Sequence, residues 1–146
     1  MKNQNAITAL SQTLAEEYLL MLKTQNFHWN VEGPLFYSLH KLFEEQYTFL
    51  AAQVDEVAER IRALGERAPG SYREFLKISK VEEAPADRVN AMRMIEILND
   101  DHESIVKRLE QFRAQADEIK DNTSVSIYDG LISFHQKAAW MIRSHR

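Results

Sequence analysis

Residues 35–64 read LFYSLHKLFEEQYTFLAAQVDEVAERIRAL, a run without proline or glycine. Such a run can form one helix about 45 Å long, at about 1.5 Å of rise per residue. Gly33-Pro34 precedes it and Gly65 follows it, where a proline suits the first turn of a helix and a glycine its end. One face carries apolar side chains at roughly heptad spacing, which predicts packing inside a helical bundle. These side chains are Phe36, Phe43, Tyr47, Leu50, Val54, Val57, Ile61 and Leu64.

A second stripe of the same helix carries His40, Glu44, Asp55 and Glu59. At about 100° per residue, their directions fall within an arc of about 100°. His40 and Asp55 nevertheless lie about 22 Å apart along the axis, so one chain cannot close all four around a metal. Because the four positions are symmetric about the middle of the helix, two copies crossing antiparallel on a two-fold axis would place His40 opposite Glu59 and Glu44 opposite Asp55. The spacing therefore predicts two identical intersubunit metal sites per dimer.

The alternative is that these acids form an ordinary solvated face. Small side chains on or beside the stripe would let two backbones approach, and together with His40 and the symmetric spacing they favour the metal site. They are Thr48, Ala51, Ala52 and Ala58. A hairpin turning at Gly33 would also bring His28 within one turn of His40. Two imidazoles with three carboxylates suit Fe(II), Zn(II) or Mn(II) better than Ca(II).

Composition narrows the class of protein. We expect residues 1–146 to form one domain. The absence of cysteine excludes disulfides, thiolate catalysis and cysteine-based zinc or iron–sulfur sites. No apolar run reaches the length of a membrane span and no signal-peptide pattern opens the chain, which predicts a cytoplasmic protein. The net charge of −4 argues against a dominant nucleic-acid surface.

Apolar periodicity predicts an all-α fold. We expect long helices over residues 5–29 and 35–64, a third opening at residues 82–85, and a last one opening at a capping box of Ser126 and Asp129. A short helix over residues 72–78 would lie in the crossover. Two hairpins with one long connection make a ferritin-like four-helix bundle.

The bundle interior offers no familiar di-iron site. The Glu-x-x-His motif of such sites does not occur in this sequence, which disfavours a di-iron centre within one chain. His102 lies near the core side of its helix, and we interpret it as structural. Iron is the metal with a role in a ferritin-like shell, so the intersubunit site is the candidate iron site.

Several motifs resemble one family. Residues 26–34 read NFHWNVEGP, residues 55–65 read DEVAERIRALG and residues 139–144 read AWMIRS. Together they closely resemble the Dps family, the ferritin-like DNA-protection-in-starvation proteins or miniferritins, over nearly the whole chain. The resemblance implies a hollow dodecamer that is a ferroxidase: it oxidises Fe(II), preferably with hydrogen peroxide, and stores ferric mineral, protecting the cell from oxidative damage.

The resemblance also assigns the ligands. His28, His40 and Glu44 would come from one subunit, and Asp55 and Glu59 from its two-fold neighbour. Family members often carry aspartate where this chain has Glu44. Trp29 is a candidate electron donor that could quench a radical; an aromatic anchor under the hairpin turn is the alternative reading, and the two are compatible.

Two further expectations concern the surface. Four acidic residues gather near the last turn between helices: Asp117, Glu118, Asp121 and Asp129. In related cages this region surrounds three-fold pores, so these acids could steer iron inward. The alternative is that they only cap and solvate helix ends. Residues 1–12 contain only one basic residue, Lys2, so we expect weak or no DNA binding, with nucleoid association left open. The competing hypotheses are a non-enzymatic nucleoid-compacting protein and a helical signalling or adhesion protein.

Overall fold

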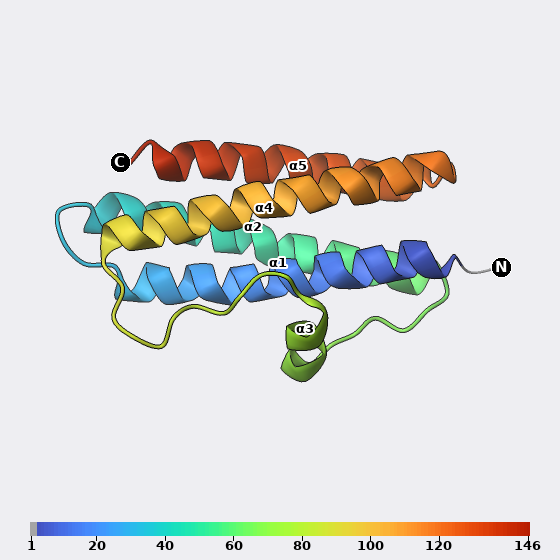
Figure 1. The fold of residues 1–146 in the computed structure, drawn as a ribbon, viewed down its shortest axis with the longest axis horizontal. Coiled ribbons are helices and arrows are strands. Elements are labelled where there is room, and N and C mark those ends of the chain that lie inside the picture. Colours follow the sequence, from blue (N-terminus) through green and yellow to red (C-terminus); the bar gives the residue numbers. More distant parts are fainter. Residues whose placement is uncertain (1–2) are drawn as a thin grey trace.

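The computed structural model describes residues 3–146 and confirms the all-α prediction (Figure 1). Its helices are α1 (Gln4–Asn30), α2 (Phe36–Ala63), α3 (Tyr72–Ile78), α4 (Ala91–Glu118) and α5 (Asn122–Arg143). No strand occurs among these described residues. Lys2, the basic residue named in the prediction about DNA binding, lies outside the described residues. Within the same range, no helix is both long and apolar enough to span a bilayer.

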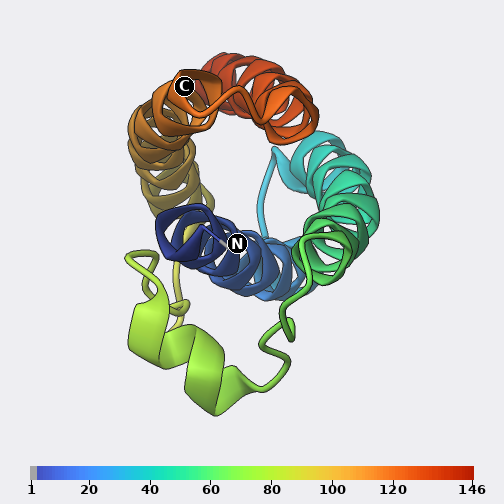
Figure 2. The same ribbon diagram turned by 90° about the vertical axis from the view of Figure 1, so that its right-hand side faces the viewer.

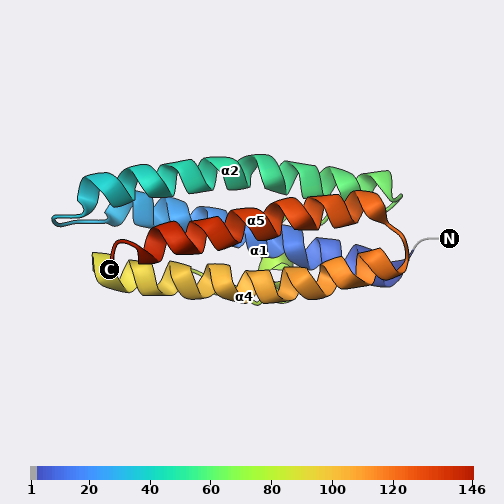
Figure 3. The same ribbon diagram turned by 90° about the horizontal axis from the view of Figure 1, so that it is seen from above.

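The four long helices form the predicted bundle. Viewed along its axis, the order around the ring is α1, α2, α5, α4, and α3 lies outside α1 in the long crossover (Figure 2). The α1–α2 and α4–α5 hairpins lie side by side along their whole length (Figure 3). The arrangement is the ferritin-like one, with a single long connection between the hairpins.

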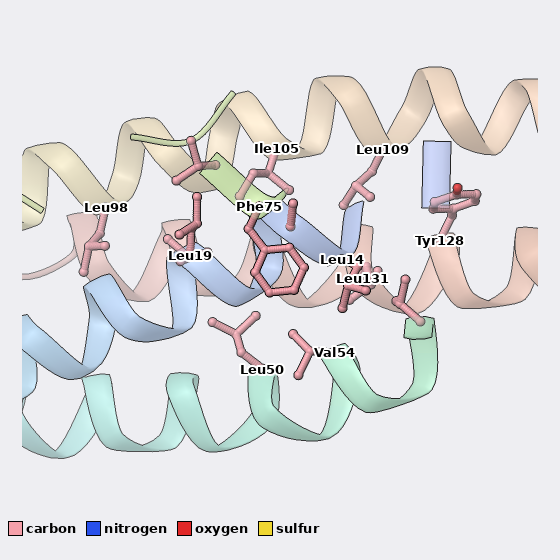
Figure 4. Packing of buried hydrophobic residues seen from close by; sticks show 14 of the residues in the cluster. Leu14, Leu19, Leu50, Val54, Phe75, Leu98, Ile105, Leu109, Tyr128 and Leu131 are labelled. Atoms are coloured by element: carbon pink, nitrogen blue, oxygen red, sulfur yellow. The ribbon is translucent and has the colours of Figure 1, made fainter. Parts of the chain in front are cut away.

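The core is a continuous apolar layer between the four helices. Leu19, Leu50, Leu98, Ile105 and Leu131 meet there from α1, α2, α4 and α5 (Figure 4). Burial of such side chains supplies the main free energy that holds the hairpins together. That residues 1–146 form a single domain stays a prediction.

The last two long helices begin elsewhere than predicted. The third does not open at residues 82–85, because α4 begins at Ala91 with Asn90 as its cap, whose side-chain oxygen accepts from the Arg93 amide at 2.8 Å. The last helix begins at Asn122 and not at Ser126, because the Asp121 carboxylate accepts from the Ser124 amide and hydroxyl. In both cases an Asn or Asp side chain satisfies free amides of the first turn, which places the start of α4 later than predicted and the start of α5 earlier.

Two apolar side chains at the ends of α4 lie outside the core. Met92 is 45% exposed and Ile119, just past the end of the helix, is 48% exposed. Both lie at ends of the helix, where the bundle no longer covers them.

Candidate metal centre

His28 and His40 face each other across the α1–α2 turn. His28 is in the last turn of α1, and His40 is in the second turn of α2. Their rings are stacked, with centroids 3.9 Å apart and planes inclined by 10°. The hairpin therefore brings together the two imidazoles that the sequence analysis selected.

Each ring is oriented by the backbone of the other residue. Nδ1 of His28 donates to the carbonyl oxygen of His40, and Nδ1 of His40 donates to the carbonyl oxygen of His28, both at 2.7 Å. A carbonyl oxygen only accepts, so Nδ1 carries the hydrogen in each ring. In the neutral rings the lone pair is then on Nε2, the tautomer that metal-binding histidines use when a carbonyl holds the other nitrogen.

Aromatic side chains hold the pair from both sides. Phe36 stacks on His40 with centroids 4.8 Å apart, and the rings of Tyr47 and His28 form a T-shaped contact with centroids 5.2 Å apart. His28 is buried and His40 half-buried. The rings are thus fixed by packing as well as by hydrogen bonds.

The three carboxylates are not gathered around this pair in one chain. Glu44 lies one turn beyond His40 on α2 and is half-buried, whereas Asp55 and Glu59 are exposed farther along the helix. Over residues 3–146, no three metal-ligating side chains of a single chain come together in a geometry that could hold an ion. Asp55 and Glu59 can therefore serve the histidine pair only from another copy.

The exposed face of α2 between the two acidic ends suits such a copy. Thr48, Ala51 and Ala52 are exposed and small. Beside them Phe49 is partly exposed, and its ring stacks on Phe134 of α5 with centroids 4.2 Å apart. This face leaves room for a second helix to approach closely.

Trp29 points away from the histidine pair. It is 62% exposed and, within the described chain, makes no ring contact with another aromatic side chain or histidine. Adjacent residues of a helix point about 100° apart, so its neighbour His28 turns inward while Trp29 turns outward. The electron-donor role of Trp29 stays a prediction.

Two of the four acids near the last turn form ion pairs with arginines. Asp121 accepts from Arg60 at 2.6 Å and Asp129 from Arg113 at 2.9 Å. Burial alone would raise the pKa of Asp121, but hydrogen bonds from Ser124 and Arg60 outweigh it and lower that pKa. Asp117 and Glu118 are exposed at the end of α4.

A second polar cluster, which the sequence analysis missed, lies inside the bundle. His135 of α5 contacts Glu17 of α1 through Nε2 and His102 of α4 through Nδ1, and all three side chains are fully buried. Burial, with His135 beside it, holds the pKa of His102 well below its ordinary value. One sequence feature could have predicted this cluster: Glu17 is a carboxylate at a core position of α1, near Leu14 and Leu20.

Comparison with known proteins agrees with this architecture. A ferritin-like domain family matches residues 7–146. The DNA protection during starvation protein 2 of Bacillus anthracis is 36% identical over 142 residues, covering 97% of this chain and 97% of that protein. The Dps structure from Staphylococcus aureus superposes with a TM-score of 0.94 at 37% identity, covering 99% of this chain and 97% of that one.

A third comparison concerns the wider superfamily. The Dps structure from Vibrio cholerae, described as a member of a broad superfamily of ferritin-like diiron-carboxylate proteins, superposes with a TM-score of 0.90 at 29% identity. It covers 97% of this chain and 88% of that one. The chain belongs to the Dps family of ferritin-like proteins.

Proposed function

We propose that this chain is a ferroxidase that oxidises Fe(II) at sites shared between two subunits and stores the ferric product. The observation that carries the proposal is the histidine pair, whose Nδ1 atoms are occupied by carbonyls so that both Nε2 atoms are left to bind a metal. Two rings fixed in this way need little rearrangement when the ion arrives. The named diiron-carboxylate superfamily of the Vibrio relative supports iron as that ion.

The carboxylates would complete the site across a two-fold axis. His28, His40 and Glu44 would come from one subunit, with Asp55 of the partner subunit and Glu59 of the partner subunit facing them. The exposed, small-residue face of α2 supports this crossing. Because a two-fold interface repeats every contact, each dimer would hold two such sites.

The donor set suits the oxidation of iron. Hard carboxylate oxygens favour Fe(III) over Fe(II), so bound Fe(II) becomes a better reductant, while the imidazoles retain the ferrous ion. Hydrogen peroxide is the preferred oxidant in this proposal, because two Fe(II) ions together supply the two electrons that reduce it to water. No hydroxyl radical is then released. Trp29 would donate an electron and quench a radical.

The larger assembly is proposed on family grounds. Twelve subunits would form a hollow shell around the ferric mineral, and Asp117, Glu118, Asp121 and Asp129 would attract iron toward its pores. The exposed Asp117 and Glu118 suit that role better than the two acids already paired with arginine. The protein would act in the cytoplasm.

The site assignment is tested by removing both imidazoles. The double variant His28→Gly/His40→Gly should lose rapid oxidation of Fe(II) by peroxide in stopped-flow absorbance while assembling into the same oligomer. His145→Gly, a histidine beyond the end of α5, is the matched control and should retain the wild-type rate. An unchanged rate in the double variant would discredit the assignment.

DNA binding is proposed to be weak or absent. Relatives carry names referring to DNA protection, but this chain has a net charge of −4, which an oligomer multiplies and which repels phosphate. Purified protein should leave plasmid mobility unchanged in a gel-shift at roughly 0.15 M salt. Robust retardation there would instead favour a nucleoid-compacting role.

A further inference from the structure

A chain of three titratable side chains crosses the centre of the bundle, far along α1 from the metal centre. Nε2 of His135 lies 2.6 Å and 2.9 Å from the two carboxylate oxygens of Glu17. Nδ1 of His135 lies 2.8 Å from Nδ1 of His102. The three residues come from α5, α1 and α4 and have no exposed surface.

The cluster is linear, which distinguishes it from a metal site. His135 uses opposite ring nitrogens for its two partners, so Glu17 and His102 lie on opposite sides of its ring. A metal ion needs ligands that converge on one point, and these residues are not among any converging group in the described chain. A linear chain of donors and acceptors instead suits a proton.

The contacts fit a charged ring at the centre. An imidazolium donates from both nitrogens and needs an acceptor at each. The Glu17 carboxylate accepts at Nε2, and the unprotonated Nδ1 of a neutral His102 accepts at the other end. Nε2 of His102 then carries its hydrogen, and this atom is buried without a partner among the described residues.

The remaining charges nearby are already paired. At the contact of α1 and α4, Glu16 pairs with Arg108 and Lys23 with Asp101, each at 2.8 Å. In the described chain, neither α2 nor α3 buries an ionisable side chain, and the other buried ionisable group of α5 is the phenol of Tyr128. An ionised Glu17 therefore has no side-chain cation except a protonated histidine.

We propose that Glu17, His135 and His102 form a buried proton-binding site, in which one proton is held on His135 between the carboxylate and the second imidazole. Its ligand is the proton itself, and the site ties α1, α4 and α5 together while it is filled. Loss of the proton leaves an uncompensated carboxylate in the core, which costs more than one unpaired N–H. The site therefore keeps its proton at pH values where exposed histidines are neutral.

The direct test counts protonated imidazoles in the assembled protein. Solid-state ¹⁵N NMR of histidine-labelled protein at about pH 8.5, two pH units above the ordinary histidine pKa, should show one imidazolium per subunit. Glu17→Gln should abolish that signal, because the carboxamide is neutral. Glu16→Gln, the buried neighbour that pairs with Arg108, should retain it. Absence of the imidazolium from the wild-type spectrum would overturn the proposal, and this result needs no variant to fold.

Stability at alkaline pH provides an independent readout. Above the histidine pKa of the unfolded chain, the folded chain would hold one more proton than the unfolded chain. The unfolding equilibrium constant of the wild type should therefore rise by up to tenfold per pH unit relative to that of Glu17→Gln. Parallel pH dependences of the two proteins would contradict the proposal. Neither readout involves iron, so the result is separate from that of the ferroxidase test.

Discussion

The rings of His28 and His40 are fixed by hydrogen bonds and by packing. Each ring donates Nδ1–H to the backbone of the other residue at 2.7 Å, and Phe36 and Tyr47 pack against the pair. Histidine ligands whose second nitrogen is held in this way lose little freedom on binding. The proposed carboxylate ligands differ, because Asp55 and Glu59 are exposed and would depend on the partner subunit for their place.

Asp55 and Glu56 offer a matched pair of exposed acids on one turn of α2. Asp55→Asn should slow the oxidation of Fe(II) by peroxide by at least about tenfold, because it removes a charged oxygen ligand. Glu56→Gln should leave the rate near that of the wild type, since Glu56 points off the stripe. Stopped-flow rates at limiting Fe(II) distinguish the two variants. Equal losses in both would mean that only the general negative charge of the helix matters.

Individual helices were predictable where capping and periodicity agree. The short helix over residues 72–78 was placed correctly, and there the Ser71 hydroxyl caps the Glu74 amide. The starts of α4 and α5 were not, because Asn90 caps α4 later than residues 82–85 and Asp121 caps α5 earlier than Ser126. The Glu17–His135 contact joins residues 118 positions apart, a pairing that no local pattern of one sequence reveals.

His102, at the contact of α4 and α5, should make the free energy of unfolding depend on pH in the acidic range. Burial lowers the pKa of His102, so the unfolded chain takes up a proton there near pH 6.5, whereas the folded chain does not. The stabilisation is present above that pH and is lost as the pH falls, by up to about 1.4 kcal/mol per pH unit. Urea unfolding between about pH 7.5 and 5.5, at one protein concentration, should show this slope.

The slope has its own control. His102→Gln should flatten the acid dependence even if the variant is less stable at every pH, because its side chain takes up no proton. His145→Gln, at the end of the chain, should keep the wild-type slope. An undiminished slope in His102→Gln would show that another group carries the acid sensitivity.

At the scale of the whole molecule, one bundle contains only part of the proposed metal centre. One chain would supply the imidazole pair and the nearby Glu44, and the symmetric spacing along α2 would supply the complementary carboxylates to a neighbour. The stripe along α2 was predictable from residues 35–64, because a single long helix fixes the relative positions of its side chains, whereas the division of ligands between two subunits stays a prediction. The packing of two subunits depends on how well their exposed α2 faces fit each other. The spacing of residues in one sequence does not specify that fit.

Complementation between two inactive variants tests this shared site most directly. Subunits carrying His28→Gly/His40→Gly and subunits carrying Asp55→Asn/Glu59→Gln should each lack rapid peroxide-driven oxidation when assembled alone. A two-fold dimer that contains one subunit of each variant has one site that lacks both sets of ligands and one site that is intact. In an equal, randomly mixed assembly, about a quarter of all sites are therefore intact, and about a quarter of wild-type activity should return. If mixed assemblies verified by mass spectrometry regain none, two chains do not jointly bind the iron.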